Sequence, residues 1–247
     1  MRNEESIIEG RNEVIEAFRA GKSVDRLFLL SGSSDGPLMT VKREAKKAGV
    51  RIDYVDRQRL DQISVTGKHQ GVIAYIAAYK YAELEDVLKS AEEKNEDPFL
   101  ILLDNITDPH NLGAIIRTAN MAGAHGVIIP KDRSSGLTAV VAKASAGAIN
   151  YTPVVKVTNL RNTMEELKKK GLWFACADMD GKNMYEQDLK GPIGLVIGSE
   201  GSGVGRLVKE SCDFTVSIPT SGDIDSLNAS VAAGVISFEI LRQRKGY

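Results

Sequence analysis

Near its carboxyl end the chain runs Ile218-Pro219-Thr220-Ser221-Gly222-Asp223-Ile224-Asp225-Ser226-Leu227-Asn228-Ala229-Ser230-Val231-Ala232. A strand-like run over 214–218 stops at Pro219, which cannot extend a hydrogen-bonded ladder. A helix is expected to begin between Ser226 and Asn228, since both are good capping residues. Such a loop exposes backbone polar groups beside a helix N-terminus, so it can hold a polar ligand. An ordinary strand-to-helix connection remains the alternative for this loop alone.

Composition predicts a globular protein with a well-developed core. The 247 residues are 43% hydrophobic and 26% charged, and no apolar run approaches the ~20 residues that a membrane span needs. The first five residues contain no signal core. Two cysteines, Cys176 and Cys212, are typical of a reducing cytoplasm. His69, His110 and His125 are scattered without ligand spacing, so we expect no metal site.

The charge distribution suggests three regions, although the net charge of −1 alone does not favour nucleic-acid binding. Residues 1–80 carry 14 Lys/Arg and 11 Asp/Glu, whereas residues 81–96 carry 2 and 6. We therefore expect a mildly basic first domain over 1–80, an acidic and partly helical linker over 81–96, and a second domain over 97–247. Any basic face must be a local patch.

The first region alternates helical and strand patterns, which predicts a small α/β domain. Helices are expected over 13–19, 37–48 and 57–64, and strands over 24–30, 50–55 and 71–77. The polar loop Gly67-Lys68-His69-Gln70-Gly71-Val72 precedes the last strand. It could contact RNA phosphate or sugar, or it could be an exposed turn.

From Phe99 the pattern predicts α/β units with a parallel sheet covered on both faces. Strands are expected over 99–103, 126–129, 173–177, 194–197 and 213–218, and helices over 112–122, 137–144, 159–169, 204–210 and 228–244. In such sheets ligands bind at the carboxyl ends of the strands.

Two further loops follow predicted strands. The first, 104–119, contains Asn111 as a candidate N-cap and Arg117 among apolar neighbours, where we expect it to be partly buried. A guanidinium in that setting suits an anion such as a phosphate, or a structural carboxylate. The second, Gly198-Ser199-Glu200-Gly201-Ser202-Gly203-Val204-Gly205, lacks the Lys of a phosphate-binding loop. Glu200 would repel a pyrophosphate and suits amide or hydroxyl donors better.

The three loops together resemble a known family. Asn111-x-Gly113-x-x-x-Arg117-Thr118-Ala119, then Ile197-Gly198-x-Glu200-x-x-Gly203, then Ile218-Pro219 through Ser226-Leu227-Asn228-x-Ser230 are similar to the three ordered motifs of the SpoU (TrmH) family. Its members are S-adenosylmethionine-dependent RNA ribose 2′-O-methyltransferases. The resemblance covers 97–247, and residues 6–80 resemble the substrate-binding domain, with a ribosomal-protein-like fold, that is often attached. Thr220-Ser221 departs from the family pattern, in which Met often follows Ile-Pro.

The resemblance implies a C-terminal α/β trefoil knot, a homodimer and a ribosomal RNA guanosine as substrate. Composition and periodicity do not predict the knot. The resemblance also implies a set of site residues. The implied catalytic residues are Arg117, Asn111, Glu200, Ser226 and Asn228. The implied contacts to S-adenosylmethionine are backbone groups at Ala177, Gly198, Ile218 and Leu227. For RNA we expect contributions from Arg11, Lys22, Arg26, Lys68 and Arg117.

The chemistry expected at Arg117 follows from the nucleophile. A ribose hydroxyl is weak and must lose a proton. Moving the pKa of a guanidinium from above ~12 to near neutral costs at least ~7 kcal/mol. We therefore expect Arg117 to bind the adjacent phosphate and to stabilise the developing alkoxide. If Arg117 instead acts as the base, ligand binding would have to shift its pKa.

Three alternatives stay open at this point. The substrate could be a tRNA guanosine. The protein could bind RNA without catalysis, against which the intact Asn111, Arg117, Glu200 and Asn228 argue. It could also be a nucleotide-binding Rossmann protein, which comparative binding of S-adenosylmethionine and NAD would reveal.

Overall fold

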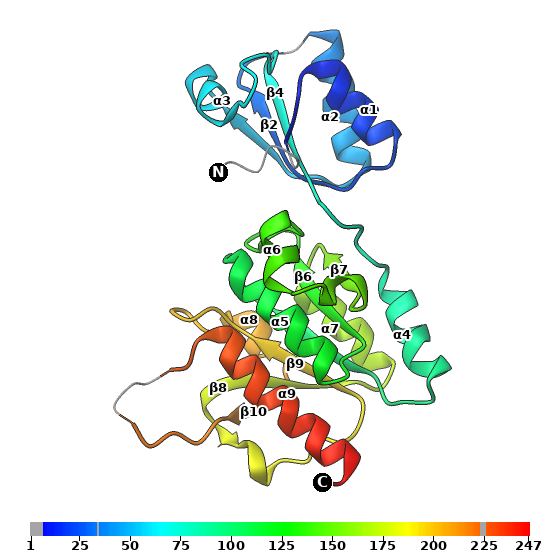
Figure 1. The fold of residues 1–247 in the computed structure, drawn as a ribbon, viewed down its shortest axis with the longest axis vertical. Coiled ribbons are helices and arrows are strands. Elements are labelled where there is room, and N and C mark those ends of the chain that lie inside the picture. The colour runs from blue at the N-terminus through cyan, green and yellow to red at the C-terminus, as the bar shows by residue number, and fades with distance from the viewer. Residues whose placement is uncertain (1–6, 34, 223–225) are drawn as a thin grey trace. The chain divides into compact units, whose positions relative to one another are not determined.

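The computed structural model describes residues 7–33, 35–222 and 226–247. The chain divides into two compact units, which are described separately (Figure 1). The first contains the described residues up to Lys80 together with Gly136–Ala139, and the second contains Tyr81–Ser135 and Val140–Tyr247. Among the described residues, no helix is both long and apolar enough to cross a membrane.

The first unit is a four-stranded mixed sheet with helices on both faces. Its elements are β1 (Ile7–Glu9), α1 (Arg11–Arg19), β2 (Val24–Leu30), α2 (Gly36–Lys47), β3 (Ile52–Val55), α3 (Arg57–Ile63) and β4 (Val72–Ile76). The strand order is β1-β4-β2-β3, with β2 and β3 parallel and the other pairs antiparallel. One core joins α1 and α2 to the sheet, and a smaller one lies under α3.

Strand β1 was not predicted, because its three residues are too few for a periodic pattern. It forms only as the partner of β4, with Ile8 opposite Ala74. The other predicted elements of this unit form within a few residues of their expected bounds.

The second unit is a six-stranded parallel sheet in the order β10-β8-β9-β5-β6-β7. The strands are β5 (Phe99–Leu103), β6 (Gly126–Pro130), β7 (Val154–Val157), β8 (Trp173–Asn183), β9 (Ile193–Ile197) and β10 (Phe214–Ser217). The helices are α4 (Leu84–Glu93), α5 (Pro109–Met121), α6 (Ala139–Ala144), α7 (Leu160–Lys169), α8 (Arg206–Lys209) and α9 (Ala229–Lys245), with short 3₁₀ turns η2 (Ala148–Asn150) and η3 (Met184–Glu186). The fold is therefore α/β with a parallel sheet, as the sequence predicts.

The acidic segment 81–96 is more than a connection. Val87 and Ala91 of α4 are fully buried, and Val87 belongs to the core cluster that α4 forms with α7 and the sheet. Leu84, Val87, Leu88 and Ala91 follow helical spacing, so the charges occupy the solvent side. Segment 81–96, predicted as a linker, is thus a packed part of the second unit.

Helices α5 and α9 lie side by side on the sheet (Figure 1). Their contact is close because Gly234 of α9 faces Thr118 of α5, whose side chain is 3.9 Å from the position of an added Cβ. The pairing brings the N-terminal turns of both helices to the carboxyl edge of the sheet.

Strand β7 was not predicted, since it has only four residues between the turns on either side of it.

Candidate active site

The loops after β5 and β9 are joined at the carboxyl edge of the sheet. These strands are neighbours, with Leu103 opposite Ile197. Asp104, the first residue after β5, is buried, and its Oδ2 accepts a hydrogen bond from the Gly205 amide at 2.7 Å. A buried carboxylate that accepts from a backbone amide holds the end of the glycine loop in place.

The glycine loop is a tight hairpin with Glu200 near its tip. The amides and carbonyls of Ser199 and Gly203 exchange hydrogen bonds at 3.2 and 2.9 Å, and the Ser199 and Ser202 hydroxyls are 2.7 Å apart. A Cβ on Gly198 would lie 2.0 Å from the Gly203 carbonyl carbon. Only glycine therefore fits at position 198, because the loop folds back onto it.

Helix α5 begins earlier than predicted, and this frees Asn111. Asp108 is the N-cap and accepts from the His110 amide, with Pro109 in the first turn. The prediction of Asn111 as N-cap is wrong, since Asp108 followed by Pro109 is the stronger start signal. Asn111 lies in the first turn, where its side-chain amide can bond elsewhere.

Asn111, Glu200 and Asn228 form one hydrogen-bonded group, one residue from each motif. Glu200 Oε1 accepts from Asn111 Nδ2 at 3.0 Å and from Asn228 Nδ2. Asn228 Nδ2 also donates to Asn111 Oδ1 at 3.0 Å. The Oδ1 of Asn228 caps α9, accepting from the Ser230 and Val231 amides as expected. The start of α9 is thus connected to α5 and the glycine loop.

A cavity of about 590 Å³ opens beside this group. The four predicted cofactor residues, Ala177, Gly198, Ile218 and Leu227, all line it, as do Glu200 and Ser226. Its volume lies within the usual range of ligand pockets, ~300–1,000 Å³. The lining combines apolar side chains with the polar backbone and hydroxyls of the glycine loop, which suits a ligand with an aromatic base and polar groups. Asp223, Ile224 and Asp225 of the quoted stretch lie outside the described residues.

Asp178 is a cavity residue that the sequence reasoning missed. Its carboxylate accepts from Lys209 Nζ at 2.6 Å. Burial raises the pKa of Asp178, but hydrogen bonds from Lys209 and the Asp180 amide outweigh it, so the pKa lies below its ordinary value. The carboxylate is therefore charged at neutral pH. Its place directly after Ala177, at the end of the strand expected over 173–177, was the available signal; in the structure β8 continues through Asp178 to Asn183.

Arg117 is exposed, contrary to the predicted partial burial. It follows Asn111 by six residues, which puts the two ~120° apart around the helix. Neither a hydrogen bond nor an ion pair involves its side chain within 7–33, 35–222 and 226–247. The structural carboxylate considered as its partner is thus not found among these residues, and Arg117 does not line the cavity.

Two of the residues expected to bind RNA have intramolecular partners. Arg11 forms an ion pair with Asp35 at 2.7 Å and donates from Nε to the Gln70 carbonyl. Arg26 pairs with Asp53 and lies 4.8 Å from the centroid of the Phe28 ring. Lys22 and Lys68 are exposed, beyond the end of α1 and in the loop before β4.

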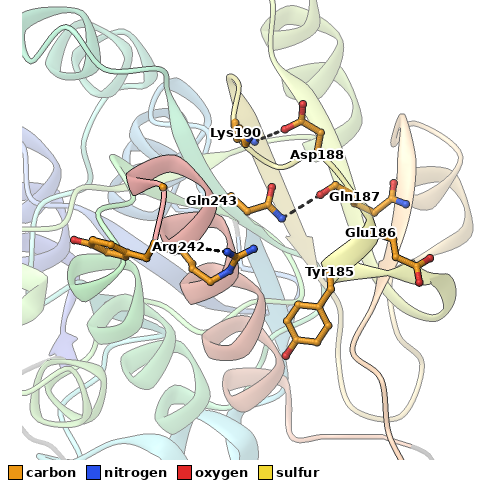
Figure 2. A pocket seen from close by; sticks show the side chains of 9 residues that line it. Tyr185, Glu186, Gln187, Asp188, Lys190, Arg242 and Gln243 are labelled. Carbon is orange, nitrogen blue, oxygen red and sulfur yellow. Dashed lines mark hydrogen bonds between the residues drawn. The ribbon is translucent and has the colours of Figure 1, made fainter.

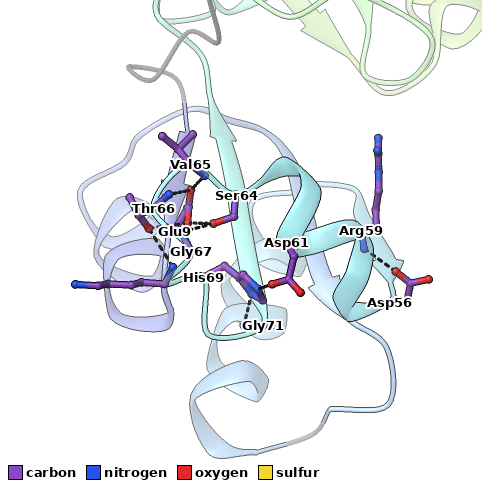
Figure 3. A network of polar contacts seen from close by, with 11 residues as sticks. Glu9, Asp56, Arg59, Asp61, Ser64, Val65, Thr66, Gly67, His69 and Gly71 are labelled. Atoms are coloured by element: carbon purple, nitrogen blue, oxygen red, sulfur yellow. Dashed lines mark hydrogen bonds and ion pairs between the residues drawn. The ribbon is translucent and has the colours of Figure 1, made fainter.

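The loop that carries Lys68 is held from inside by Glu9 (Figure 3). The Glu9 carboxylate accepts from the Ser64 and Thr66 hydroxyls at 2.6 and 2.9 Å and from the Val65 and Thr66 amides. Burial raises the pKa of Glu9, but these hydrogen bonds outweigh it and hold it below its ordinary value. This part of the loop motif is structural.

His69 is also structural. Its Nδ1 accepts from the Gly71 amide at 3.0 Å, so the ring proton lies on Nε2 and is donated to Asp61 at 2.9 Å (Figure 3). The imidazole is buried, and Gln70 and Gly71, which follow it in the chain, have positive φ. The loop therefore presents Lys68 to solvent while His69 anchors it.

A second hollow, of about 500 Å³, lies near the C-terminal end of α9 (Figure 2). Its polar groups bond to each other: Arg242 donates to the Tyr247 carbonyl and to Glu239, and Gln243 donates to the Gln187 carbonyl. None of the predicted site residues lines it. These contacts fasten the end of α9 to the segment after β8, so we assign them a structural role.

Nowhere in 7–33, 35–222 or 226–247 do three His, Cys, Asp or Glu side chains gather as a metal site would require.

Comparison with protein families finds two matches in this chain. Residues 98–238 match the SpoU rRNA Methylase family. The chain belongs to this family. Residues 7–82 match the domain described as RNA 2′-O ribose methyltransferase substrate binding. The protein is accordingly an S-adenosylmethionine-dependent RNA methyltransferase of the TrmH/SpoU family.

Relatives match along almost the whole chain. A Bacillus subtilis protein named as a TrmH family tRNA/rRNA methyltransferase, YacO, is 50% identical over 245 residues, which is 99% of this chain and 98% of that protein. A Staphylococcus saprophyticus protein of the same description is 43% identical, with 98% and 97% covered. The crystal structure of AviRb from Streptomyces viridochromogenes in complex with AdoMet is similar in fold, with a TM-score of 0.62, 24% identity, and 98% and 91% of the two chains covered.

Proposed function

We propose that this protein methylates the 2′-hydroxyl of a ribose in ribosomal RNA, at a guanosine, with S-adenosylmethionine as methyl donor. One observation carries the proposal: Asn111, Glu200 and Asn228 join the three motif loops beside a cavity lined by every predicted cofactor residue. The matched substrate-binding domain supports a ribose in RNA as the target.

The cavity fits the cofactor in size and in the chemistry of its walls. Ile197, Val216 and Ile236 offer an apolar surface to an adenine ring, and the backbone of 198–203 offers amides and carbonyls. Asp178, held charged by Lys209, suits a cationic or hydroxyl group of the ligand. When bound, S-adenosylmethionine supplies a methyl group that its sulfonium already activates. The AviRb structure contains AdoMet in the same fold.

The protein must position the ribose and stabilise negative charge on its oxygen. Glu200 holds the amides of Asn111 and Asn228 in fixed orientations, so their remaining hydrogen-bonding capacity is pre-organised. The exposed Ser226 hydroxyl lines the cavity and can bond to the ribose. Arg117 binds the adjacent phosphate and stabilises the developing alkoxide, which needs no change in its protonation.

Arg117 acts in a homodimer in this proposal. Met121 on α5 and Val231 and Phe238 on α9 are large apolar side chains with 62%, 48% and 44% exposure. They lie on two adjacent helices, and Met121 is one helical turn from Arg117. Assembly through this face would bury them and enclose Arg117 at the junction of two copies, with a self-complementary contact. The proposal also includes a trefoil knot in the C-terminal methyltransferase domain and a cytoplasmic location.

The test is to map ribose methylation in ribosomal and transfer RNA from cells with and without this protein. We expect one rRNA guanosine to lose its methyl group and to regain it when the purified protein and labelled S-adenosylmethionine are added. A change confined to a tRNA guanosine would favour the alternative substrate, which is consistent with the description of the relatives as tRNA/rRNA methyltransferases. Transfer to a base would refute the ribose target.

The role of Arg117 is tested separately. Arg117→Lys keeps the charge but loses the planar fork that binds phosphate through two hydrogen bonds. We expect kcat to fall at least about tenfold while S-adenosylmethionine affinity is unchanged. Near-normal turnover of Arg117→Lys would refute the proposed role of Arg117. An active protein that sediments as a monomer would refute the homodimer.

A further inference from the structure

Positive charge in the first unit is concentrated in α2, β3 and the start of α3. Residues 42–59 contain seven Lys/Arg and three Asp/Glu, a net charge of +4, whereas residues 1–80 as a whole carry +3. None of the four N-terminal residues predicted to bind RNA lies in this segment. The charge is therefore local, and the rest of the unit is slightly acidic.

An exposed aromatic ring lies within this segment. Tyr54 is on β3, an edge strand of the first sheet, and 55% of its surface is exposed. Ile52, two residues earlier on the same face, packs into the core under α1 and α2. Tyr54 thus lies on the α2 side of the sheet, where the helix no longer covers the strand.

The ring has a cation beside it. Lys42 Nζ lies 5.4 Å from the Tyr54 ring centroid and donates to the Ser33 carbonyl at 3.0 Å. This second contact fixes the ammonium near the ring. Lys46 follows one turn later on the same helix face, is exposed, and forms no ion pair with a described residue. Met39, one turn before Lys42, is 53% exposed and extends the apolar surface.

An aromatic ring flanked by cations is the arrangement that binds an unpaired nucleotide. The base stacks on the ring and the cations contact the phosphates on either side. Arg43, Lys47 and Arg51 form ion pairs with carboxylates, whereas Lys42 and Lys46 pair with no carboxylate in the part of the chain that the structure describes. The uncompensated charge therefore lies on the side of α2 from which Lys42 reaches the Tyr54 ring.

We infer that Tyr54, with Lys42 and Lys46, is a docking site for an unpaired nucleotide of the RNA substrate, an inference that rests on the proposed function. The site determines which RNA segment is held and does not take part in methyl transfer. It replaces Arg11 and Arg26, whose side chains are occupied within the protein, as the RNA contact of the first unit.

The experiment compares full-length variants in binding and in turnover. The probes are a 16-nucleotide single-stranded oligouridylate for affinity and protein-free ribosomal RNA for methyl transfer. We expect Tyr54→Ala to weaken binding about 5- to 100-fold, the range seen for one stacked base, and to raise KM for RNA with kcat and S-adenosylmethionine affinity unchanged. Tyr54→Phe should stay within about twofold of the wild type, since the ring is kept.

A matched pair of lysines separates position from charge. Lys46→Ala and Lys47→Ala each remove one charge from α2, but Lys47 Nζ is 3.5 Å from Glu44 on another side of the helix. We expect the Lys46 variant alone to weaken binding and to reduce its salt dependence. An equal loss of RNA affinity in the two lysine variants, or an unchanged KM for RNA in Tyr54→Ala, would overturn the inference. The surface would then be assigned to a protein partner. RNA binding that depends on Tyr54 without methyl transfer would support it and refute the proposed function instead.

Discussion

The Asn228 side chain caps α9 and also bonds to the candidate active site, and the substitution Asn228→Asp separates these two roles. Its Oδ1 caps α9, and its Nδ2 donates to Glu200 and Asn111. Asn228→Asp keeps an oxygen for the Ser230 and Val231 amides, and a negative charge suits a helix N-terminus. It removes the donor, however, and places a second carboxylate against Glu200.

The cost to the site can be worked out from these contacts. Losing a hydrogen bond to a charged group costs about 1.5–3 kcal/mol. Two carboxylates about 3 Å apart in a water-exposed site repel by about 1.4 kcal/mol. If the transition state requires the hydrogen bond between Asn228 and Glu200, the two contributions together raise its free energy by roughly 3–4 kcal/mol. This corresponds to a fall of about 10²- to 10³-fold in kcat/KM.

The assay is single-turnover methyl transfer from labelled S-adenosylmethionine to protein-free ribosomal RNA, with thermal unfolding measured in parallel. We expect the melting temperature of Asn228→Asp to change by no more than a few degrees. The matched control is Ser230→Ala, which removes only the hydroxyl that donates to Asn228 Oδ1 and should keep most activity. A rate for Asn228→Asp within about threefold of the wild type, or an equal loss in Ser230→Ala, would refute the reasoning.

Three further predictions follow from single contacts. Gly198→Ala should abolish S-adenosylmethionine binding in calorimetry because its Cβ would collide with the Gly203 carbonyl carbon, whereas Gly201→Ala, with open space around it, should bind normally. Val87→Ala should lower the stability to urea by roughly 2 kcal/mol; no effect would mean that α4 is not packed. Glu9→Gln should destabilise by roughly 1–2 kcal/mol at pH 7. Because the folded pKa of Glu9 is lowered, its contribution is present above the ordinary value and lost as pH falls below it, so wild type and Glu9→Gln should converge in acid; a constant difference would contradict this.

Most elements were predictable from local pattern. The long strands of the parallel sheet are continuous apolar runs, and the helices carry amphipathic spacing and capping residues, so their bounds follow from nearby residues. The failures are features that local pattern cannot specify. Strand β1 exists only through its pairing with β4, and the packing of α4, in a segment that was expected to be partly helical, depends on the core that it joins.

The sequence by itself determined the class of fold and the three loops that carry the site, because strand ends, glycines and capping residues act within a few positions of one another. The four residues that the family resemblance implies as cofactor contacts, Ala177, Gly198, Ile218 and Leu227, all line the cavity, whereas Asp178 was missed. Only the tertiary structure decided which side chains meet. Asn111 and Asn228 are 117 residues apart and bond because α5 and α9 pack side by side, and Arg117 is exposed because its position on α5 faces away from the sheet. Contacts between distant segments depend on how helices and strands pack against each other, and no local stretch of sequence encodes that packing.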